Sequence, residues 1–378
     1  MTRRVVYLTG TRADFGLMLP TLLTIAARPG LELELVVTGM HLSARYGHTL
    51  AEVRASGLPI HTLIPVDVDQ DGGLAMARAA SCVAQGMTEY MAQRRPQICL
   101  LLGDRWEMLA TAMTATLAGV PIFHLCGGER SGSVDDAMRH AVSKLAHMHG
   151  VATIGARDRL LALGEEPWRI HQVGTPGLVG LTSLIKADRA TLARQYGLHA
   201  DAPIALILFH PVVQEAEWAG AQMASALAAV HAQGLQMLCL MPNADAGNTA
   251  IRHAIEAAKT KMNSLRVVTH LPRQDYLSWL AVADLLVGNS SSGIIEAASL
   301  GIPVVNIGDR QLGRERNANT FDCMPDTASV EAAIRQAKAY SPSDRHNIYG
   351  DGQTNVRVAD LIEHIPINAA LLNKRLTY

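Results

Sequence analysis

The chain has 378 residues, of which 49% are hydrophobic and 18% are charged, so it is long enough for two domains with cores of ordinary size. Its 33 Lys and Arg residues nearly balance its 34 Asp and Glu residues, which argues against a nucleic-acid partner. No apolar stretch approaches the ~20 residues that a membrane span requires, and the apolar run after Arg4 ends too early for a signal peptide. With five cysteines and no CxxC spacing, we expect a cytoplasmic protein with reduced thiols.

The first half of the chain alternates short apolar runs with longer amphipathic segments. We expect helices at 15–27 (FGLMLPTLLTIAA) and 105–118 (RWEMLATAMTATLA). A repeated strand–helix–strand pattern gives a parallel sheet that helices cover on both faces. The expected strands are 5–10 (VVYLTG), 33–39 (LELVVTG), 98–104 (ICLLLGD), 120–125 (VPIFHL) and 150–155 (GVATIG).

The pattern breaks at 173–181 (VGTPGLVGL), which contains three Gly and a Pro, and then restarts. We therefore expect an α/β protein with two doubly wound, Rossmann-like domains, 1–175 and 185–378, a linker at 176–184, and a cleft between the strand ends. The last helices are assigned to the second domain, with packing on the first domain as the alternative. The expected elements of the second half are strands at 203–211, 235–243, 265–272, 283–293 and 302–310, and helices at 218–234 and within 356–372.

Polar motifs follow the expected strands in both halves, at the strand ends where α/β proteins bind ligands. Each motif taken alone is also an ordinary turn, but together they mark one side of both sheets. The motifs are TGTRADFG, TGMHLSARYG, LLGDRWE and HLCGGERSGSVDD in the first half, and FHP, MPNADAG, HLPRQDY, GNSSSGIIE and NIGDRQLGRER in the second.

The loop Gly288–Gly293 (GNSSSG) lies between an apolar strand and a helix. Unpaired N–H groups and the dipole at the helix start favour a phosphate, to which the serines at 290–292 can donate hydrogen bonds. Glu296 lies about one turn further on, where it can accept from ribose hydroxyls. The structural alternative is an N-cap serine with a first-turn Glu. The cations that we expect close to this phosphate are Arg310, Arg314 and Arg316.

Other ligand classes lack their motifs. No Gly-Lys-Ser/Thr follows the GNSSSG loop, so it is not a P-loop, and no GxGxxG supports a nicotinamide cofactor. His140, His147 and His149 are close in sequence, but helical geometry does not place all three on one face. We therefore expect neither a metal site nor a cofactor.

A set of motifs extends in order over nearly the whole chain: GTRADFG, VTGMHLSARYG, GDRWE, GGERSGSVDDAMRHAVSKLAH, HPV, PNADAG, GNSSSG…E and IGDRQLGRE. In this the chain resembles the hydrolysing UDP-N-acetylglucosamine 2-epimerases. The resemblance implies a GT-B-like fold whose two domains clamp a UDP-sugar, and a homodimer or homotetramer. That family makes N-acetylmannosamine for sialic acid synthesis, and relatives act on UDP-2,4-diacetamido-2,4,6-trideoxyglucose for legionaminic acid.

The reaction that the resemblance implies removes the C2 proton of the sugar while UDP leaves C1, which gives a 2-acetamidoglucal. Water then adds at C1, and a proton reaches C2 from the opposite face. This inversion needs a base and an acid on two faces of one ring, and the leaving diphosphate needs cations and helix ends. Asp104 and Asp135 are the implied acid–base residues, with Glu129 as a third. For both aspartates a helix N-cap is the structural alternative.

The resemblance also implies a set of substrate-binding residues. Arg12, Arg105 and His210 are expected at the diphosphate or the sugar. Asn243 and Asp245 belong to the PNADAG motif of the same set. The remaining implied contacts are Ser290 and Ser291 to the phosphates, Glu296 to the ribose and Arg310 to the leaving group.

One residue departs from the family pattern. Relatives read His-x-Glu-Gly-Gly-Glu where this chain reads HLCGGE, so Cys126 replaces a Glu that is assigned as catalytic in those relatives. A thiol is a poor general acid unless its pKa is lowered. Either Glu129 or Asp135 takes the missing role, or the substrate differs, for example by a 6-deoxy carbon or a bulkier C4 group.

Three other functions share parts of this pattern. A GT-B glycosyltransferase uses the same kind of UDP site, but it needs an acceptor groove where this chain has GDR and GGE…DD. A non-hydrolysing 2-epimerase usually carries an HVEAGLRTG-like stretch in place of GGERSG. A nucleotide-sugar sensor would keep the anion-binding loops but would not need the acidic residues. Grouping several carboxylates in one cleft is electrostatically unfavourable, which argues against a sensor.

Overall fold

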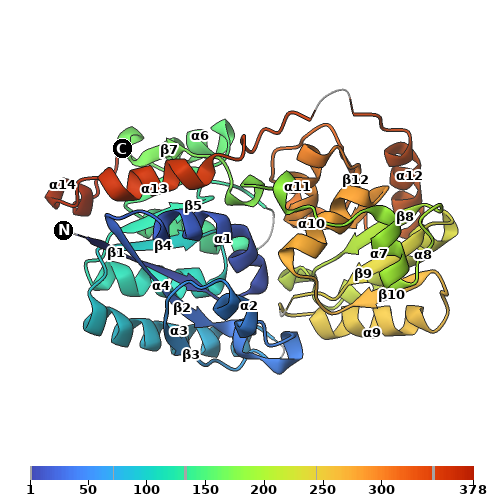
Figure 1. Cartoon of the computed structure of the whole chain (residues 1–378), viewed down its shortest axis with the longest axis horizontal. Coiled ribbons are helices and arrows are strands. Elements are labelled where there is room, and N and C mark those ends of the chain that lie inside the picture. Colours follow the sequence, from blue (N-terminus) through green and yellow to red (C-terminus); the bar gives the residue numbers. More distant parts are fainter. Residues whose placement is uncertain (1, 71, 132–133, 244, 343–344) are drawn as a thin grey trace. The chain divides into compact units, whose positions relative to one another are not determined.

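A computed structural model of the chain describes residues 2–70, 72–131, 134–243, 245–342 and 345–378. They form two structural units, each built on its own parallel sheet. Figure 1 shows both units, coloured from blue at the N-terminus to red at the C-terminus. Unit 1 comprises Met1–Arg130, Val134–Val179 and Ile348–Tyr378, and unit 2 comprises Ser131–Ser133 and Gly180–Asn347.

The described part of unit 1 contains seven parallel strands in the order β3-β2-β1-β4-β5-β6-β7. The central strand β4 (ICLLL) is an apolar run that is buried on both faces. The strand order reverses between β1 and β4, and doubly wound sheets bind ligands at the carboxyl ends beside such a reversal. The strands are β1 (Arg3–Thr9), β2 (Leu31–Thr38), β3 (Ile60–Ile64), β4 (Ile98–Leu102), β5 (Ile122–Leu125), β6 (Met148–Val151) and β7 (Ile170–Gln172).

Helices cover both faces of this sheet. On one face, Val5 and Tyr7 of β1 pack in a core with α1 and α13. On the other face, Val6 and Leu8 of the same strand pack with α3 and α4, as the alternation of side chains along a strand requires. The helices of unit 1 are α1 (Arg12–Ala26), α2 (Leu50–Ala55), α3 (Gly73–Arg94), α4 (Trp106–Leu117), α5 (Val134–Leu145), α6 (Ile154–Ala162), α13 (Thr354–His364) and α14 (Ala369–Leu372).

Residues 348–378 belong to unit 1, whereas the predicted division placed them at the end of the second domain. The reason is the apolar face of α13, which buries Val358 and Ile362 in the same core as α1. Figure 1 shows α13, in red, in the same unit as the blue α1. Arg28 adds an ion pair to Asp360 (2.6 Å). In the structure, α13 thus packs on the core of unit 1.

The described part of unit 2 contains six parallel strands in the order β10-β9-β8-β11-β12-β13, which reverses between β8 and β11. The strands are β8 (Ile204–Leu208), β9 (Gln236–Leu240), β10 (Leu265–Val268), β11 (Leu285–Gly288), β12 (Val304–Ile307) and β13 (Thr320–Cys323). The helices are α7 (Arg189–Tyr196), α8 (Ala219–Ala232), α9 (Asn248–Lys259), α10 (Arg273–Val282), α11 (Ser291–Leu300) and α12 (Thr327–Lys338). The core formed by β8, β9, α8 and α12 includes Ile207, Leu227 and Ile334.

The structure differs from the sequence predictions mainly at edges and boundaries. The predicted strand 150–155 ends at Val151, because Thr153 caps a new helix that begins at Ile154. The strands β3, β7 and β13 were not predicted; they lie at sheet edges and are largely half-buried, so they lack a strong apolar pattern. No helix in the described residues has both the length and the apolar character needed to cross a bilayer.

Candidate functional site

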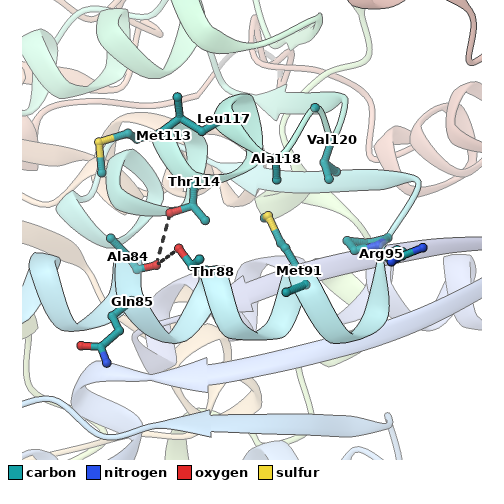
Figure 2. A pocket seen from close by; sticks show the side chains of 13 residues that line it. Ala84, Gln85, Thr88, Met91, Arg95, Met113, Thr114, Leu117, Ala118 and Val120 are labelled. Carbon is teal, nitrogen blue, oxygen red and sulfur yellow. Dashed lines mark hydrogen bonds between the residues drawn. The ribbon is translucent and has the colours of Figure 1, made fainter.

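A surface pocket of about 790 Å³ lies between α3 and α4, and Figure 2 shows the side chains that line it. Its lining includes Arg95 and Val120, which lie shortly before β4 (from Ile98) and β5 (from Ile122) in the chain. The pocket therefore lies toward the amino ends of the strands. Because the polar motifs follow the carboxyl ends, the candidate site is elsewhere.

Asp104 and Glu129 in unit 1 meet at one buried arginine, Arg139 of α5. Asp104 follows β4 and Glu129 follows β5, and these strands are neighbours in the sheet. Arg139 is 1% exposed; it pairs with Asp104 Oδ2, and its Nη1 lies 3.7 Å from Glu129 Oε2. The same Nη1 donates to the carbonyl of Cys126 (3.1 Å). Since a buried charge needs charged or hydrogen-bonded partners, Arg139 fixes both carboxylates at the strand ends.

Asp135 lies in the first turn of α5, four residues before Arg139, so the two residues share a face of this helix. Gly132 and Ser133 of the same motif lie outside the described residues. Asp104 is not the N-cap residue of α4; that residue is Arg105, whose side chain makes no capping hydrogen bond.

Arg105 and Arg12 supply cations at the strand ends of unit 1. Arg105 Nε pairs with Glu107 Oε2 (3.1 Å), and burial raises the pKa of the Glu107 carboxyl. A Cβ on Gly10 would lie 2.8 Å from Glu107 Oε1, so the backbone after β1 packs directly against this ion pair. Arg12 begins α1; burial lowers its pKa to about 10 while Glu52 opposes the shift, so Arg12 is charged at neutral pH.

The motif GTRAD contains a residue that the sequence did not single out. Asp14 accepts hydrogen bonds from the backbone N–H groups of Gly10 (3.0 Å) and Thr11 (2.7 Å), and Thr11 caps α1 in return. Asp14 Oδ1 also accepts from the Tyr7 hydroxyl (3.3 Å). Asp14 therefore holds the turn from which Arg12 projects.

Cys126 follows β5 in a left-handed conformation, with φ 59°, and is 8% exposed. An L-residue adopts this conformation only at a cost of about 1 kcal/mol. Its Sγ lies 3.8 Å from Thr175 Oγ1, and its carbonyl accepts from Arg139. The backbone of Cys126 is thus linked through Arg139 to the carboxylates of Asp104 and Glu129.

A second residue that the sequence analysis missed is His124, on β5. Its Nε2 lies 2.7 Å from the carbonyl of Gly103, which precedes Asp104, and its Nδ1 lies 3.2 Å from Ser143 Oγ on α5. Burial lowers the pKa of His124 to about 3, so it is neutral at pH 7 and links β4, β5 and α5 by hydrogen bonds alone. Neither His124 nor Arg139 could be found from sequence, because burial of a polar residue leaves no signal in the periodicity.

His210, Asn243 and Asp245 gather at the strand ends of unit 2. Asn243 N donates to His210 Nδ1 (3.3 Å), and Asn243 Nδ2 donates to Asp245 Oδ2 (2.5 Å). Asn289 exchanges two hydrogen bonds with the backbone of His210, at 2.7 and 2.8 Å, which joins the end of β8 to the end of β11. Ala244 of the PNADAG motif lies outside the described residues.

The last residue of β11 lies so close to the neighbouring strand β8 that only glycine fits there. Gly288 has φ 147°, and a Cβ there would lie 2.0 Å from the Leu208 carbonyl oxygen. Ser290 is the N-cap of α11 and accepts from Ser292 N (3.3 Å), while Ser291 is the first residue of the helix. The N-cap alternative therefore holds for Ser290, and the N–H groups of the first turn of α11 remain an anion-binding feature.

Glu296 is 2% exposed and pairs with Arg273 of α10. It also accepts a hydrogen bond from the Ser292 hydroxyl, which contacts the Tyr276 hydroxyl. Glu296 is thus held inside a polar cluster at the start of α11, and Arg273 is a cation that the sequence analysis did not assign to this loop.

The three arginines of the next loop have different partners. Arg310 Nη1 donates to the Asn289 carbonyl (3.1 Å), which places it at the GNSSSG loop. Arg314 Nε donates to Gln311 Oε1 (2.7 Å). Arg316 pairs with Asp322 (2.9 Å) on β13, so the expectation that it directly serves the same loop receives no support from its contacts.

No group of three or more His, Cys, Asp or Glu residues in the described part of the chain is arranged to hold a metal ion. Of the three nearby histidines, His140 lies on α5 and His149 on β6. His149 Nε2 contacts Glu165 Oε2 at 3.0 Å.

A family model described as UDP-N-acetylglucosamine 2-epimerase matches residues 23–363. The chain belongs to this family. It is 41% identical over 374 residues to the UDP-N,N'-diacetylbacillosamine 2-epimerase (hydrolyzing) of Legionella pneumophila, which covers 99% of both chains. It is 29% identical to the GDP/UDP-N,N'-diacetylbacillosamine 2-epimerase (hydrolyzing) of Campylobacter jejuni, over 85% of this chain and 84% of that protein. The family expected from the motifs is confirmed.

The epimerase fold is confirmed by comparison with solved structures. The crystal structure of UDP-GlcNAc 2-epimerase from Neisseria meningitidis bound to UDP-GlcNAc matches with a TM-score of 0.81, over 95% of this chain and 99% of that one. The sequence identity is 15%, so this likeness concerns the fold alone. The described residues form two α/β units, whose sheets have seven and six parallel strands, as predicted for a GT-B-like fold.

Proposed function

We propose that this chain is a hydrolysing 2-epimerase, which converts a UDP-2-acetamido sugar and water into UDP and the free sugar epimerised at C2. The observation that carries the proposal is the group of Asp104, Glu129 and Arg139 at the ends of β4 and β5, in a chain of the 2-epimerase family. The Legionella and Campylobacter relatives both carry the word hydrolyzing in their names, which supports this class over the non-hydrolysing one.

In the first step, a carboxylate takes the C2 proton and the C2–H electron pair forms the C1=C2 double bond. The C1–O bond breaks, and its electron pair leaves with UDP. Asp104 is the proposed base, because 23% of its side chain is exposed, against 5% for Glu129 on the same arginine. A base must reach the proton that it removes, and of the two only Asp104 is open enough for a ligand to contact directly.

In the second step, the C1=C2 electron pair of the glucal takes a proton at C2 on the opposite face, and the oxygen of a water molecule bonds to C1 while that water releases one proton. Overall one water is consumed, and UDP and the free epimer are the products. Asp135 is the proposed acid, since it lies on the face of α5 that carries Arg139. We assign a supporting role to Glu129. It takes the place of the Glu that relatives carry at position 126, because Arg139 contacts both the Glu129 carboxylate and the Cys126 carbonyl.

The groups proposed to bind the UDP part are concentrated in unit 2. The start of α11, with Ser290 and Ser291, offers N–H and O–H donors to a diphosphate, and Arg310 adds a cation beside the Asn289 carbonyl. Glu296 is the proposed ribose acceptor, held by Arg273. The hydrogen-bonded group of His210, Asn243 and Asp245 supports the sugar nucleotide, and Arg12 and Arg105 supply positive charge in unit 1.

The proposed substrate is UDP-2,4-diacetamido-2,4,6-trideoxyglucose rather than UDP-N-acetylglucosamine. The support is the 41% identity to the Legionella enzyme, whose name gives this sugar as its substrate under its common name. The small, buried side chain of Cys126 is compatible with a sugar that lacks the 6-hydroxyl and carries a larger C4 group. A homodimer or homotetramer and a cytoplasmic location complete the proposal.

The test is incubation with each UDP-sugar in heavy water, without any acceptor. We expect free UDP together with the free epimer carrying deuterium at C2, and faster turnover of the diacetamido sugar. Deuterated UDP-sugar without net release of UDP would instead identify a non-hydrolysing epimerase. Turnover that begins only when an acceptor is added would identify a transferase.

A further inference from the structure

The last turn of α5 is capped by a lysine from a distant part of the chain. Lys374 Nζ donates to the carbonyls of Ser143 (3.0 Å), Lys144 (2.9 Å) and Ala146 (2.8 Å). An α-helix leaves its last carbonyls without partners inside the helix, and a cation at that end is also favoured by the helix dipole. Lys374 therefore ties the segment after α14 to the helix that carries Arg139.

Glu165 holds this ammonium group in place. Glu165 is 0% exposed; it pairs with Lys374 Nζ (2.6 Å) and also contacts Lys144 Nζ (3.0 Å) and His149 Nε2 (3.0 Å). Burial alone would raise the pKa of Glu165, but the hydrogen bonds from His149 and Lys374 lower it to about 2. The carboxylate is therefore charged at neutral pH and fixes the position of Lys374.

A buried arginine fixes the same segment independently. Arg169 is 0% exposed and donates to the carbonyls of Ala370 (2.9 Å) and Leu371 (2.8 Å). It also donates to the carbonyl of His147 (3.0 Å), which lies just after α5. Two cations thus join residues 370–374 to the end of this helix.

The capped turn is connected to the acidic group in two ways. Ser143, whose carbonyl accepts from Lys374, lies one turn after Arg139 on α5. Its hydroxyl contacts His124 Nδ1 (3.2 Å), and His124 Nε2 contacts the carbonyl of Gly103 (2.7 Å), next to Asp104. A shift in the last turn of α5 would therefore displace both Arg139 and the loop that carries Asp104.

Resting on the proposed function, we infer that Lys374 is a positioning residue for proton transfer, which acts by holding the end of α5 and, through it, Arg139 and Asp104. Small displacements of catalytic groups are costly, and about 1 Å can lower a rate ~100-fold. Because Arg169 still holds the segment in a Lys374→Met variant, we expect a smaller loss, about tenfold in kcat, with KM changed less than about twofold.

Lys144→Met is the matched control. Both lysines pair with Glu165, but only Lys374 donates to the carbonyls that end α5; Lys144 Nζ donates to the carbonyl of Leu163 (2.6 Å) instead. We expect Lys144→Met to keep a kcat near that of the natural chain. The two variants are compared with the UDP-sugar that the natural chain turns over. Equal kcat for Lys374→Met and the natural chain, or an equal loss in both lysine variants, would overturn the inference.

Amide hydrogen exchange of α5 gives a readout that does not depend on activity. We expect faster exchange in the last turn of α5 in Lys374→Met than in Lys144→Met, with the rest of unit 1 unchanged. If the natural chain releases no UDP from any UDP-sugar, the proposed function fails, while the exchange rates still decide whether Lys374 holds the helix. Unchanged exchange in α5 would contradict that holding role.

Two double variants separate positioning from general stability. In Lys374→Met, Glu165 keeps Lys144 and His149 as partners, so adding Glu165→Gln should lower thermal stability further but leave kcat near that of Lys374→Met. A further fall of kcat in step with stability would overturn the inference. If Lys374 acts through Arg139, then Lys374→Met adds little further loss of kcat in an Arg139→Met background. Fully additive losses would contradict this route.

Discussion

Unit 1 and unit 2 carry different functional groups in the loops beside the reversal of strand order. In unit 1 the loops after the central strands hold carboxylates, and the buried Arg139 organises Asp104 and Glu129. In unit 2 the corresponding loops hold hydroxyl, amide and imidazole groups, organised by hydrogen bonds such as that from His210 N to Asn289 Oδ1 (2.7 Å). Moving protons at carbon requires ionisable groups in fixed places, whereas binding a diphosphate requires donors and cations. The comparison predicts that variants of the unit 1 carboxylates change turnover and that variants of the unit 2 loops change UDP affinity.

The largest expected effect is on turnover, from Asp104→Asn. Removing the proposed base, while keeping its size, should lower kcat at least ~100-fold and leave the Kd for UDP largely unchanged. The measurement is steady-state UDP release together with calorimetric UDP binding. Asp135→Asn should behave in the same way. A near-natural rate from either variant would remove that residue from the chemistry and weaken the contrast between the units.

Arg310→Ala tests the other half of the comparison. Loss of a cation at the GNSSSG loop should weaken UDP binding about tenfold, with a smaller effect on kcat. Arg316→Ala is the matched control, since it removes the same charge from the same loop but from a side chain that pairs with Asp322. Equal loss of UDP affinity in both variants would mean that the overall charge of this loop, rather than the position of Arg310, determines binding.

Cys126→Glu sharpens the proposal for the sugar. A larger and charged side chain at a position that is 8% exposed should lower kcat/KM for the diacetamido sugar by about tenfold relative to UDP-N-acetylglucosamine. Competition between the two UDP-sugars measures this ratio directly. An unchanged ratio would show that residue 126 does not select the sugar.

The smallest effect concerns stability and pH. The pKa of Glu165 is about 2 in the folded chain and near 4.5 when unfolded, so its ion pairs stabilise the fold above about pH 4.5. This stabilisation is lost as the pH falls toward 2. We expect the natural chain to be more stable than Glu165→Gln by about 1 to 3 kcal/mol at pH 7, and the difference to shrink below pH 4.5. Urea unfolding at several pH values measures it; a constant difference would contradict the pairing with Lys374 and His149.

Much of the fold could be predicted because buried parallel strands are continuous apolar runs. The runs ICLLL and IALIL became β4 and β8, with every residue buried. The edge strands β3, β7 and β13 could not be predicted, since a half-exposed strand of three to five residues has little pattern. The placement of α13 depended on which core its apolar face completes, and a single sequence does not encode that choice locally.

The residues of the candidate site also fall into those that could be predicted and those that could not. The residues that follow strands, such as Asp104 and Ser290, could be singled out because strand ends are visible in the sequence. The roles of the residues that organise them could not be predicted: nothing in the sequence around Arg139 and Arg273 shows that both make ion pairs with buried or half-buried carboxylates. Their roles depend on side chains that meet only after folding.

Gly288 limits how this enzyme can be altered. Its α-carbon passes so near the Leu208 carbonyl that no other amino acid fits without pushing two central strands apart. If unit 2 binds the nucleotide as we propose, attempts to change its nucleotide preference must therefore leave Gly288 untouched. Any change of preference has to come from the surrounding side chains, such as Arg310 and His210, which can be exchanged without spreading the sheet.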